Sequence, residues 1–195
     1  MKGGALSIKI LDNLDDSNII IDNCSFKSCV SEYGGAIYIY FEQKCLFNIS
    51  NSYFYNNRAT SIQGGSIYAT TSIKSIIEFI NCTIESMNNC NSFYLNNLNY
   101  SMENCEFNNN RISNPNIETS STIYSTNSNG ILNNCLFNSN SASYNSDSLY
   151  SKPTFFTDGN YIFDECKFNN NQAQGYRNSY CGSLCISKSK SFGLL

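Results

Sequence analysis

Apolar and polar residues alternate over short stretches of this chain, and the alternation restarts about every 23 to 31 residues. Each restart carries the tetrapeptide Asn-Cys-x-Phe or a close variant of it. The second position of the tetrapeptide is occupied in its six copies by Cys24, Ser52, Cys82, Cys105, Cys135 and Cys166. Self-similarity at this period is typical of proteins that are built from stacked repeats.

Apolar residues flank the tetrapeptide at fixed distances. Three residues before its second position stand Ile21, Ile49, Phe79, Met102, Leu132 and Phe163, and two residues after it stand Phe26, Phe54, Ile84, Phe107, Phe137 and Phe168. Alternation on both sides of a two-residue polar break predicts two short strands that meet at a tight bend. The first residue of the break is Asn in five of the six copies, and Asn tolerates the left-handed conformation that such a bend requires.

A second block follows each tetrapeptide after a gap of variable length. It reads Gly-Gly-Ala-Ile-Tyr at 34–38 and Gly-Gly-Ser-Ile-Tyr at 64–68, with weaker copies at 91–94, 121–124, 147–150 and 182–185. Paired glycines allow a sharp turn of the backbone, and the alternating residues after them predict a third short strand. The gaps of variable length are the loops in which a repeat array absorbs insertions.

Asparagine also recurs five residues after the cysteine position. Asn57, Asn110, Asn140 and Asn171 occupy this position, while the other two copies carry Cys29 and Met87. We expect such asparagines to form hydrogen bonds with their neighbours in the coils above and below. Turn preference alone is an alternative explanation of the same pattern.

Three short strands with one inward face each cannot bury that face until successive turns stack. The sequence therefore predicts an all-β, right-handed parallel β-helix (β-solenoid) of about six to seven coils with three short strands per coil. We expect the β-helix to cover residues 1–187 and residues 188–195 to leave it as a C-terminal tail. Because Gly3-Gly4-Ala5-Leu6 is the second block of a coil, we interpret the chain as a fragment of a longer array with adjoining coils.

The Gly-Gly-Ala-[Ile/Leu] motifs at 3–6 and 34–37 and the Phe-x-x-Asn motifs resemble the repeats of the polymorphic outer membrane protein family. The Phe-x-x-Asn motifs lie at 54–57, 107–110, 137–140 and 168–171. The resemblance covers almost the whole chain and implies a parallel, pectin-lyase-like β-helix on a cell surface or outside the cell, with a role in adhesion. Chlamydial members also carry an autotransporter barrel, and nothing in this chain resembles one.

Composition narrows the choice of function. The net charge of −3 and the absence of a Lys/Arg cluster exclude a basic nucleic-acid footprint, and no stretch is apolar enough to span a bilayer. The chain has ten cysteines and no histidine. We interpret the repeated cysteines as small buried apolar residues, with disulfides or a metal site as alternatives. No cofactor or metal is expected.

Tyrosines end most copies of the second block and are the candidate binding residues. Period-two geometry turns them outward, so the sequence predicts a column of exposed rings: Tyr38, Tyr68, Tyr94, Tyr124 and Tyr150. Such a column suits a host-cell protein or glycan, or it stabilises the sheet through contacts between neighbouring rings.

The acids are scattered along the chain, so we expect no enzyme but a non-catalytic, surface-displayed module, adhesin-like or a structural spacer. The alternative is a carbohydrate-active, pectin-lyase-like β-helix whose active site lies in missing coils or variable loops.

Overall fold

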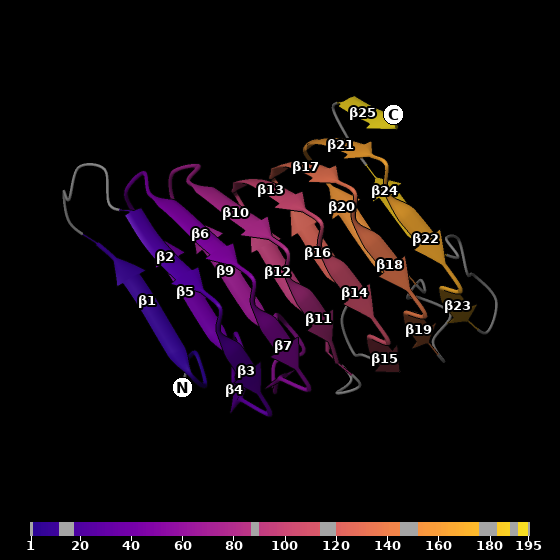
Figure 1. Ribbon diagram of the computed structural model, residues 1–195, viewed down its shortest axis with the longest axis horizontal. Coiled ribbons are helices and arrows are strands. Elements are labelled where there is room, and N and C mark those ends of the chain that lie inside the picture. The colour runs from indigo at the N-terminus through magenta and orange to yellow at the C-terminus, as the bar shows by residue number, and fades with distance from the viewer. Residues whose placement is uncertain are drawn as a thin grey trace.

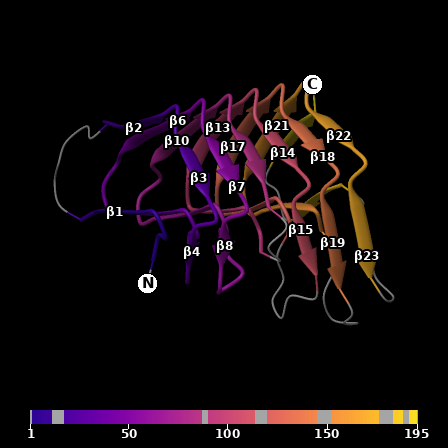
Figure 2. The same ribbon diagram turned by 60° about the horizontal axis from the view of Figure 1, so that its bottom comes forward.

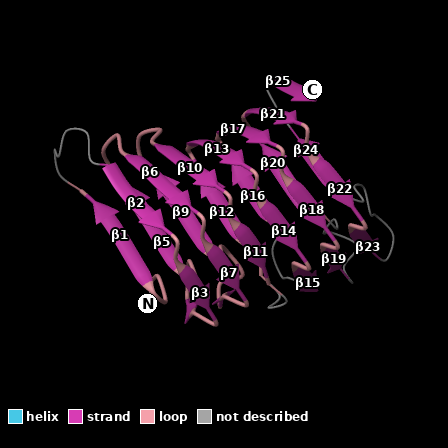
Figure 3. Cartoon of the chain, in the orientation of Figure 1, coloured by secondary structure: helices cyan, strands magenta, loops and turns pink. Residues whose placement is uncertain are grey.

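The computed structural model describes residues 2–11, 18–86, 90–113, 120–144, 152–175, 183–187 and 191–194. All regular structure in these residues is β-strand, as Figure 3 shows, and consecutive coils pair in parallel. The strands stack side by side into a rod that runs from β1 to β24 (Figure 1). The fold class predicted from the sequence, a parallel β-solenoid, is confirmed.

Three long sheets form the walls of the rod. The first sheet contains, in spatial order, β1 (Leu6–Ile10), β5 (Ile37–Phe41), β9 (Ile67–Thr71), β12 (Phe93–Asn96), β16 (Ile123–Thr126), β20 (Thr154–Thr157) and β24 (Leu184–Ser187). The second contains β2 (Asn18–Asp22), β6 (Leu46–Ser50), β10 (Ile76–Ile80), β13 (Asn99–Glu103), β17 (Asn129–Asn133), β21 (Asn160–Asp164) and β25 (Ser191–Leu194). The third contains β3 (Ser25–Lys27), β7 (Tyr53–Tyr55), β11 (Thr83–Glu85), β14 (Glu106–Asn108), β18 (Leu136–Asn138) and β22 (Lys167–Asn169).

Most coils also contain a fourth, very short strand that the sequence did not predict. These strands are β4 (Val30–Ser31), β8 (Arg58–Ala59), β15 (Arg111–Ser113), β19 (Ser141–Tyr144) and β23 (Gln172–Gly175). They pair into one sheet of two strands and one of three, along one edge of the rod (Figure 2). A segment of two to four residues is too short to show an alternation of its own.

Equivalent residues of successive coils lie directly above one another. Phe54 pairs with Ile84, and Ile84 in turn pairs with Phe107. The six copies of the bend are separated by five full turns of the chain, so the count is slightly below the predicted six to seven coils. The distance between repeats in the sequence varies because the loops differ in length. The register of the three sheets stays the same from coil to coil.

Aromatic rings fill the interior. Phe93 is fully buried and packs edge-on against Phe54 and Phe107, with ring centroids 6.2 and 5.3 Å apart. Phe107 also stacks on Phe137 at 5.0 Å, and Phe137 stacks on Phe168 at 4.8 Å. The spacing of these stacked rings matches the strand separation of a β-sheet, so the coil repeat and the aromatic column reinforce each other.

The bend between the second and third sheets has the predicted backbone conformation. Asn23, Asn51, Asn81, Asn104, Asn134 and Glu165 have φ angles between 48° and 53°. Asn tolerates this conformation better than most L-residues. Its side chain also bonds to the bend of the neighbouring coil, as in the bonds from Asn81 to Asn51 at 3.1 Å and from Asn104 to Asn81 at 3.2 Å, and both effects favour Asn at the bend.

The repeated cysteines lie inside the rod, as predicted. Cys82, Cys105 and Cys135 are at most 1% exposed, and each thiol donates to a carbonyl of the preceding coil at 3.4 to 3.6 Å. They are free thiols. Cys24 and Cys166 are only partly buried. They precede β3 and β22, the two end strands of the third sheet.

The predicted C-terminal tail needs correction. Residues 188–195 were expected to leave the array, but Ser191–Leu194 forms β25 and pairs with β21 from Asn160 to Phe163. A parallel ladder depends on backbone groups, so the chain continues the second sheet although the Ser/Lys-rich segment before β25 breaks the side-chain pattern.

Candidate functional site

The structure brings four of the predicted tyrosines together in one column on the outer side of the first sheet. In register, Tyr38 lies against Tyr68, Tyr68 against Tyr94, and Tyr94 against Tyr124. The rings stack with centroids 5.5, 4.7 and 5.5 Å apart and with planes inclined by 9°, 4° and 2°. Tyr150 lies outside the described residues, and Phe155 takes the next place in the column.

The tyrosine column (Tyr38, Tyr68, Tyr94 and Tyr124) is less exposed than the sequence predicted. Tyr38 is only 4% exposed, and the other three rings are half-buried. Alternation correctly places the rings on the outer side of the sheet, but it carries no information on the loops that cover that side. The Tyr33 ring contacts Tyr68 edge-on at 5.2 Å and forms part of this cover.

A hollow of about 230 Å³ opens at the N-terminal end of the tyrosine column. Lys2, Tyr33, Tyr38, Gln63 and Tyr68 line it. The Lys2 ammonium group lies 5.0 Å from the centroid of the Tyr38 ring and donates to its hydroxyl at 3.4 Å. A cation, an amide and phenol groups thus surround one opening, a combination suited to a polar ligand with a flat apolar face.

Burial and the neighbouring phenols raise the pKa of Tyr68 well above its ordinary value, and burial raises the pKa of Tyr94. Both hydroxyls therefore remain neutral across the physiological pH range. In this form they donate and accept hydrogen bonds and do not act as bases near neutral pH.

The asparagines five residues after the cysteine position form the predicted hydrogen-bonded ladder inside the rod. Asn140 accepts from the backbone and side-chain nitrogens of Asn110 at 3.0 and 2.8 Å, and it donates to Asn171 at 2.9 Å. Asn57 likewise accepts from the backbone nitrogen of Cys29 at 2.9 Å. Asn57, Asn110 and Asn140 are fully buried, so this ladder holds the corner of the coil together and offers no surface to a ligand.

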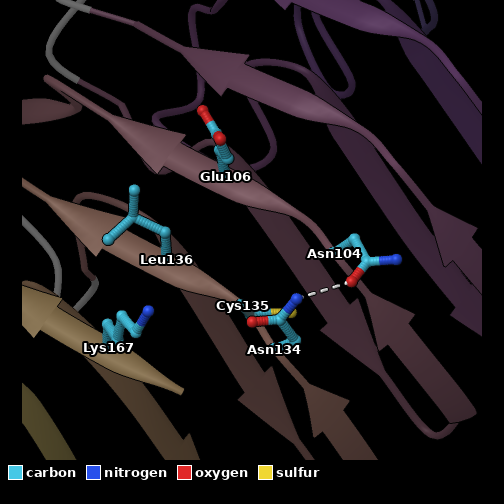
Figure 4. Close-up of a pocket in the computed structure, with 6 residues that line it drawn as sticks. All are labelled: Asn104, Glu106, Asn134, Cys135, Leu136 and Lys167. Carbon is cyan, nitrogen blue, oxygen red and sulfur yellow. Dashed lines mark hydrogen bonds between the residues drawn. The ribbon is translucent and has the colours of Figure 1, made fainter. Parts of the chain in front are cut away.

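A smaller hollow of about 220 Å³ lies at the bend between the second and third sheets (Figure 4). Glu106, Leu136 and Lys167 come from three neighbouring strands and project from the same side of the third sheet. Asn134 donates to Asn104 at 2.8 Å beside them. Leu136 stands between the two charged groups, so the arrangement offers no paired acid and base to a substrate.

The outer face of the second sheet is a surface that the sequence reasoning missed. It carries a larger hollow of about 450 Å³ over β10, β13, β17 and β21. The available signal was an apolar residue at an outward position, such as Ile131 or Ile162, four residues before the cysteine position. The same position holds Asn48, Glu78 and Ser101 in three of the other copies, so the outward residues form no apolar column that repeats along the chain.

Among the described residues, no group of three or more His, Cys, Asp and Glu side chains is placed to hold a metal ion. In that part of the chain there is also no helix of the length and apolarity needed to cross a membrane.

The fold and its surfaces define the class of this protein: a parallel β-solenoid with side-chain columns that continue from coil to coil. Comparison of the chain with family models, with curated proteins and with solved structures found no match.

Proposed function

We propose that this chain is a non-catalytic β-helix module displayed at a cell surface, where it acts as an adhesin-like binder or as a structural spacer. The tyrosine column is the observation that carries the proposal. Tyr38, Tyr68, Tyr94 and Tyr124 hold their rings parallel across four coils, so the backbone register positions them before any partner arrives. Rings fixed in this way lose little conformational entropy on binding.

Support for a spacer comes from the same column. Each stacked pair of rings adds a favourable contact between neighbouring coils beyond the backbone ladder. A rod that gains stability from every coil keeps its length, which a spacer needs. Binding and spacing are therefore compatible roles of one surface.

The distribution of carboxylates favours binding over the alternative of a carbohydrate-active enzyme. Glu78 and Glu103 lie on neighbouring strands but at different register positions, since Glu78 pairs with Ser101 and Glu103 with Ile80. Asp22 and Asp164 lie in more distant coils of the same sheet. None of these four carboxylates is directly paired in register with another, which supports binding over glycoside hydrolysis, a reaction that needs two carboxylates facing one bond.

The proposal is tested by replacing Tyr68, Tyr94 and Tyr124 together with Ser and measuring attachment of the protein to host cells and to immobilised glycans. We expect attachment to fall at least tenfold, because three aromatic contacts are lost. The matched control replaces Tyr53 and Tyr55 of β7 with Ser, which removes a stacked pair of tyrosines from the third sheet. Unchanged attachment by a triple variant that still gives a β-sheet circular dichroism spectrum would remove the tyrosine column from the binding surface.

A further inference from the structure

The outer face of the second sheet is open and partly apolar. Ile20, Ile131 and Ile162 point outward from β2, β17 and β21 and are 64%, 46% and 40% exposed. Leu46 on β6 is also exposed. Ile131 and Ile162 pair in register and form one apolar pair on this face, while Asn48, Glu78 and Ser101 separate them from Ile20.

A depression crosses this face because the outward side chains differ in size. Ser101 occupies one place in a column between the larger Glu78 and Ile131. Tyr100 and Gly130 point inward, so they contribute backbone to the floor of the hollow. The result is a shallow channel of about 450 Å³ that runs across four parallel strands.

A ladder of amides forms one wall of this channel. Asn129 donates to the side-chain oxygen of Asn99 at 2.8 Å, and Asn160 donates to that of Asn129 at 2.9 Å. Ile131 and Ile162 lie beside the ladder, two residues further along the same strands. One side of the channel therefore carries the amides of three successive coils after Ile76, and the other side carries Glu78 and Ser101 followed by the C–H surface of Ile131 and Ile162. Neighbouring positions in each row are one strand spacing, ~4.8 Å, apart.

The charge of this face is one-sided. Asp22, Glu78, Glu103 and Asp164 project outward from the six strands between β2 and β21, and these strands contain no Lys or Arg. Lys44 and Lys74 are exposed in the loops that lead into β6 and β10, at the edge of the face. A second copy of this face or an anionic polysaccharide would bring like charges together, whereas a cationic ligand would be attracted.

We propose that the channel on the second sheet binds an unbranched polysaccharide that carries free amino groups. Its sugar rings would lie with their C–H faces on Ile76, Ile131 and Ile162, and their hydroxyls would hydrogen-bond to the amide ladder. Its ammonium groups would lie near Glu78 in the channel and near Glu103 and Asp164, which stand two coils apart in the next outward row. Each sugar ring advances the chain by about one strand spacing (~4.8 Å), so successive rings lie over successive coils. Neighbouring β-1,4-linked rings are flipped, so every second ring turns its amino group to the same side of the channel.

This inference rests on the proposed function only in treating the chain as a binding module. It concerns a different face from the tyrosine column. A basic peptide shares the positive charge but does not repeat at the spacing of the coils, because an extended chain advances about 3.3 Å per residue. Periodicity therefore favours the polysaccharide over the peptide.

The test measures binding of a β-1,4-linked glucosamine hexamer to the chain by isothermal titration calorimetry. Ser101→Tyr fills the channel with a side chain that strands accept readily, and we expect it to weaken binding at least tenfold. Thr83→Tyr on the outer face of the third sheet is the matched control and should leave binding unchanged. Glu78→Gln should weaken binding roughly threefold to fivefold and reduce its salt dependence.

Three results would overturn the proposal. One is binding that Ser101→Tyr leaves intact. Another is equal binding of the fully N-acetylated hexamer, which would remove the charge argument. The third is that a Lys-rich peptide binds as tightly as the hexamer and that Ser101→Tyr also weakens its binding. This result would identify the channel as a peptide site. The two proposals can be separated. If the hexamer does not bind in the channel but the Tyr68, Tyr94 and Tyr124 triple variant loses attachment, the channel proposal fails and the proposed function stands.

Discussion

Asparagine performs three structural tasks in this chain, and its position in the coil decides which one. Asn104 adopts a φ of 52° at the bend, where a left-handed residue is required. Asn140 lies inside the corner and satisfies backbone groups that water cannot reach. Asn129 lies in the outward amide ladder. One residue type recurs because an amide both donates and accepts, so it can bond to its copy above and below.

The inner ladder should contribute strongly to stability. Replacing Asn140 with Ala leaves the backbone nitrogen of Asn110 and the carbonyl of Phe107 without their present partners. We expect the free energy of unfolding to fall by about 3 kcal/mol in urea titrations, since each buried group loses a hydrogen bond. Asn133→Ala, at an exposed outward position of β17, is the control and should cost less than about 0.5 kcal/mol. Similar costs for the two variants would show that the inner ladder is not a stabilising element.

At the scale of the elements, the space for an inward side chain depends on the residues at the same position in the neighbouring coils. Gly130 shows this dependence. It occupies an inward position of β17, where the other described coils carry Ile19, Phe47, Ile77, Tyr100, Tyr161 and Phe192. A Cβ atom there would lie 2.5 Å from Cζ of Tyr100. The ring of Tyr100 therefore fills the space that a side chain at Gly130 would need, and its hydroxyl donates to Ser125 at 3.1 Å.

Gly130→Ala should therefore destabilise the protein by about 1–3 kcal/mol, because the ring of Tyr100 must move. In a Tyr100→Ile background, which copies Ile77 of the preceding coil, the same change should cost at least about 1 kcal/mol less. A double-mutant cycle of urea unfolding measures this coupling. Gly193→Ala in β25 is the control, since its Cβ would meet only Ile162 at an ordinary 3.9 Å. If the losses in unfolding free energy at Gly130 and Tyr100 are additive, the ring of Tyr100 does not fill the space beside Gly130 in the way described.

At the scale of the whole molecule, burial depends on how many coils cover a residue. Phe93 lies in a central coil and is fully buried. Phe26 lies in β3, the first strand of the third sheet, and is only partly buried although it stacks on Phe54 at 5.0 Å. Each coil of a solenoid contacts only its neighbours, so a residue in a terminal strand lacks cover on one side.

Truncation of the two phenylalanines should show this difference. We expect Phe93→Ala to lower the free energy of unfolding by about 3–5 kcal/mol, as is typical of a fully buried ring. Phe26→Ala should cost about half as much, because less apolar surface leaves the interior. Chemical denaturation of both variants provides the measurement. A cost at Phe26 equal to that at Phe93 would mean that the outermost coil is as well covered as the centre.

The predictable part of the fold was the part that repeats. The apolar columns, the bend asparagines and the Gly-Gly turns recur in several coils, so each copy supports the others. The fourth short strand and β25 were missed because backbone pairing forms them without a side-chain pattern. At the candidate site the sequence placed Tyr68 and Tyr94 in one column, but it gave no indication that Tyr38 would be covered.

The sequence by itself determined the coil: which residues face inward, where the backbone turns and which side chains repeat. These properties follow from local geometry, since strand alternation and left-handed bends depend on a few neighbouring residues. Only the tertiary structure decided which outer faces are open. The loops cover part of the first sheet, whereas Ile131 and Ile162 of the second sheet remain exposed. Coverage depends on how segments far apart in the chain fold over one another, and no local pattern of polar and apolar residues encodes that.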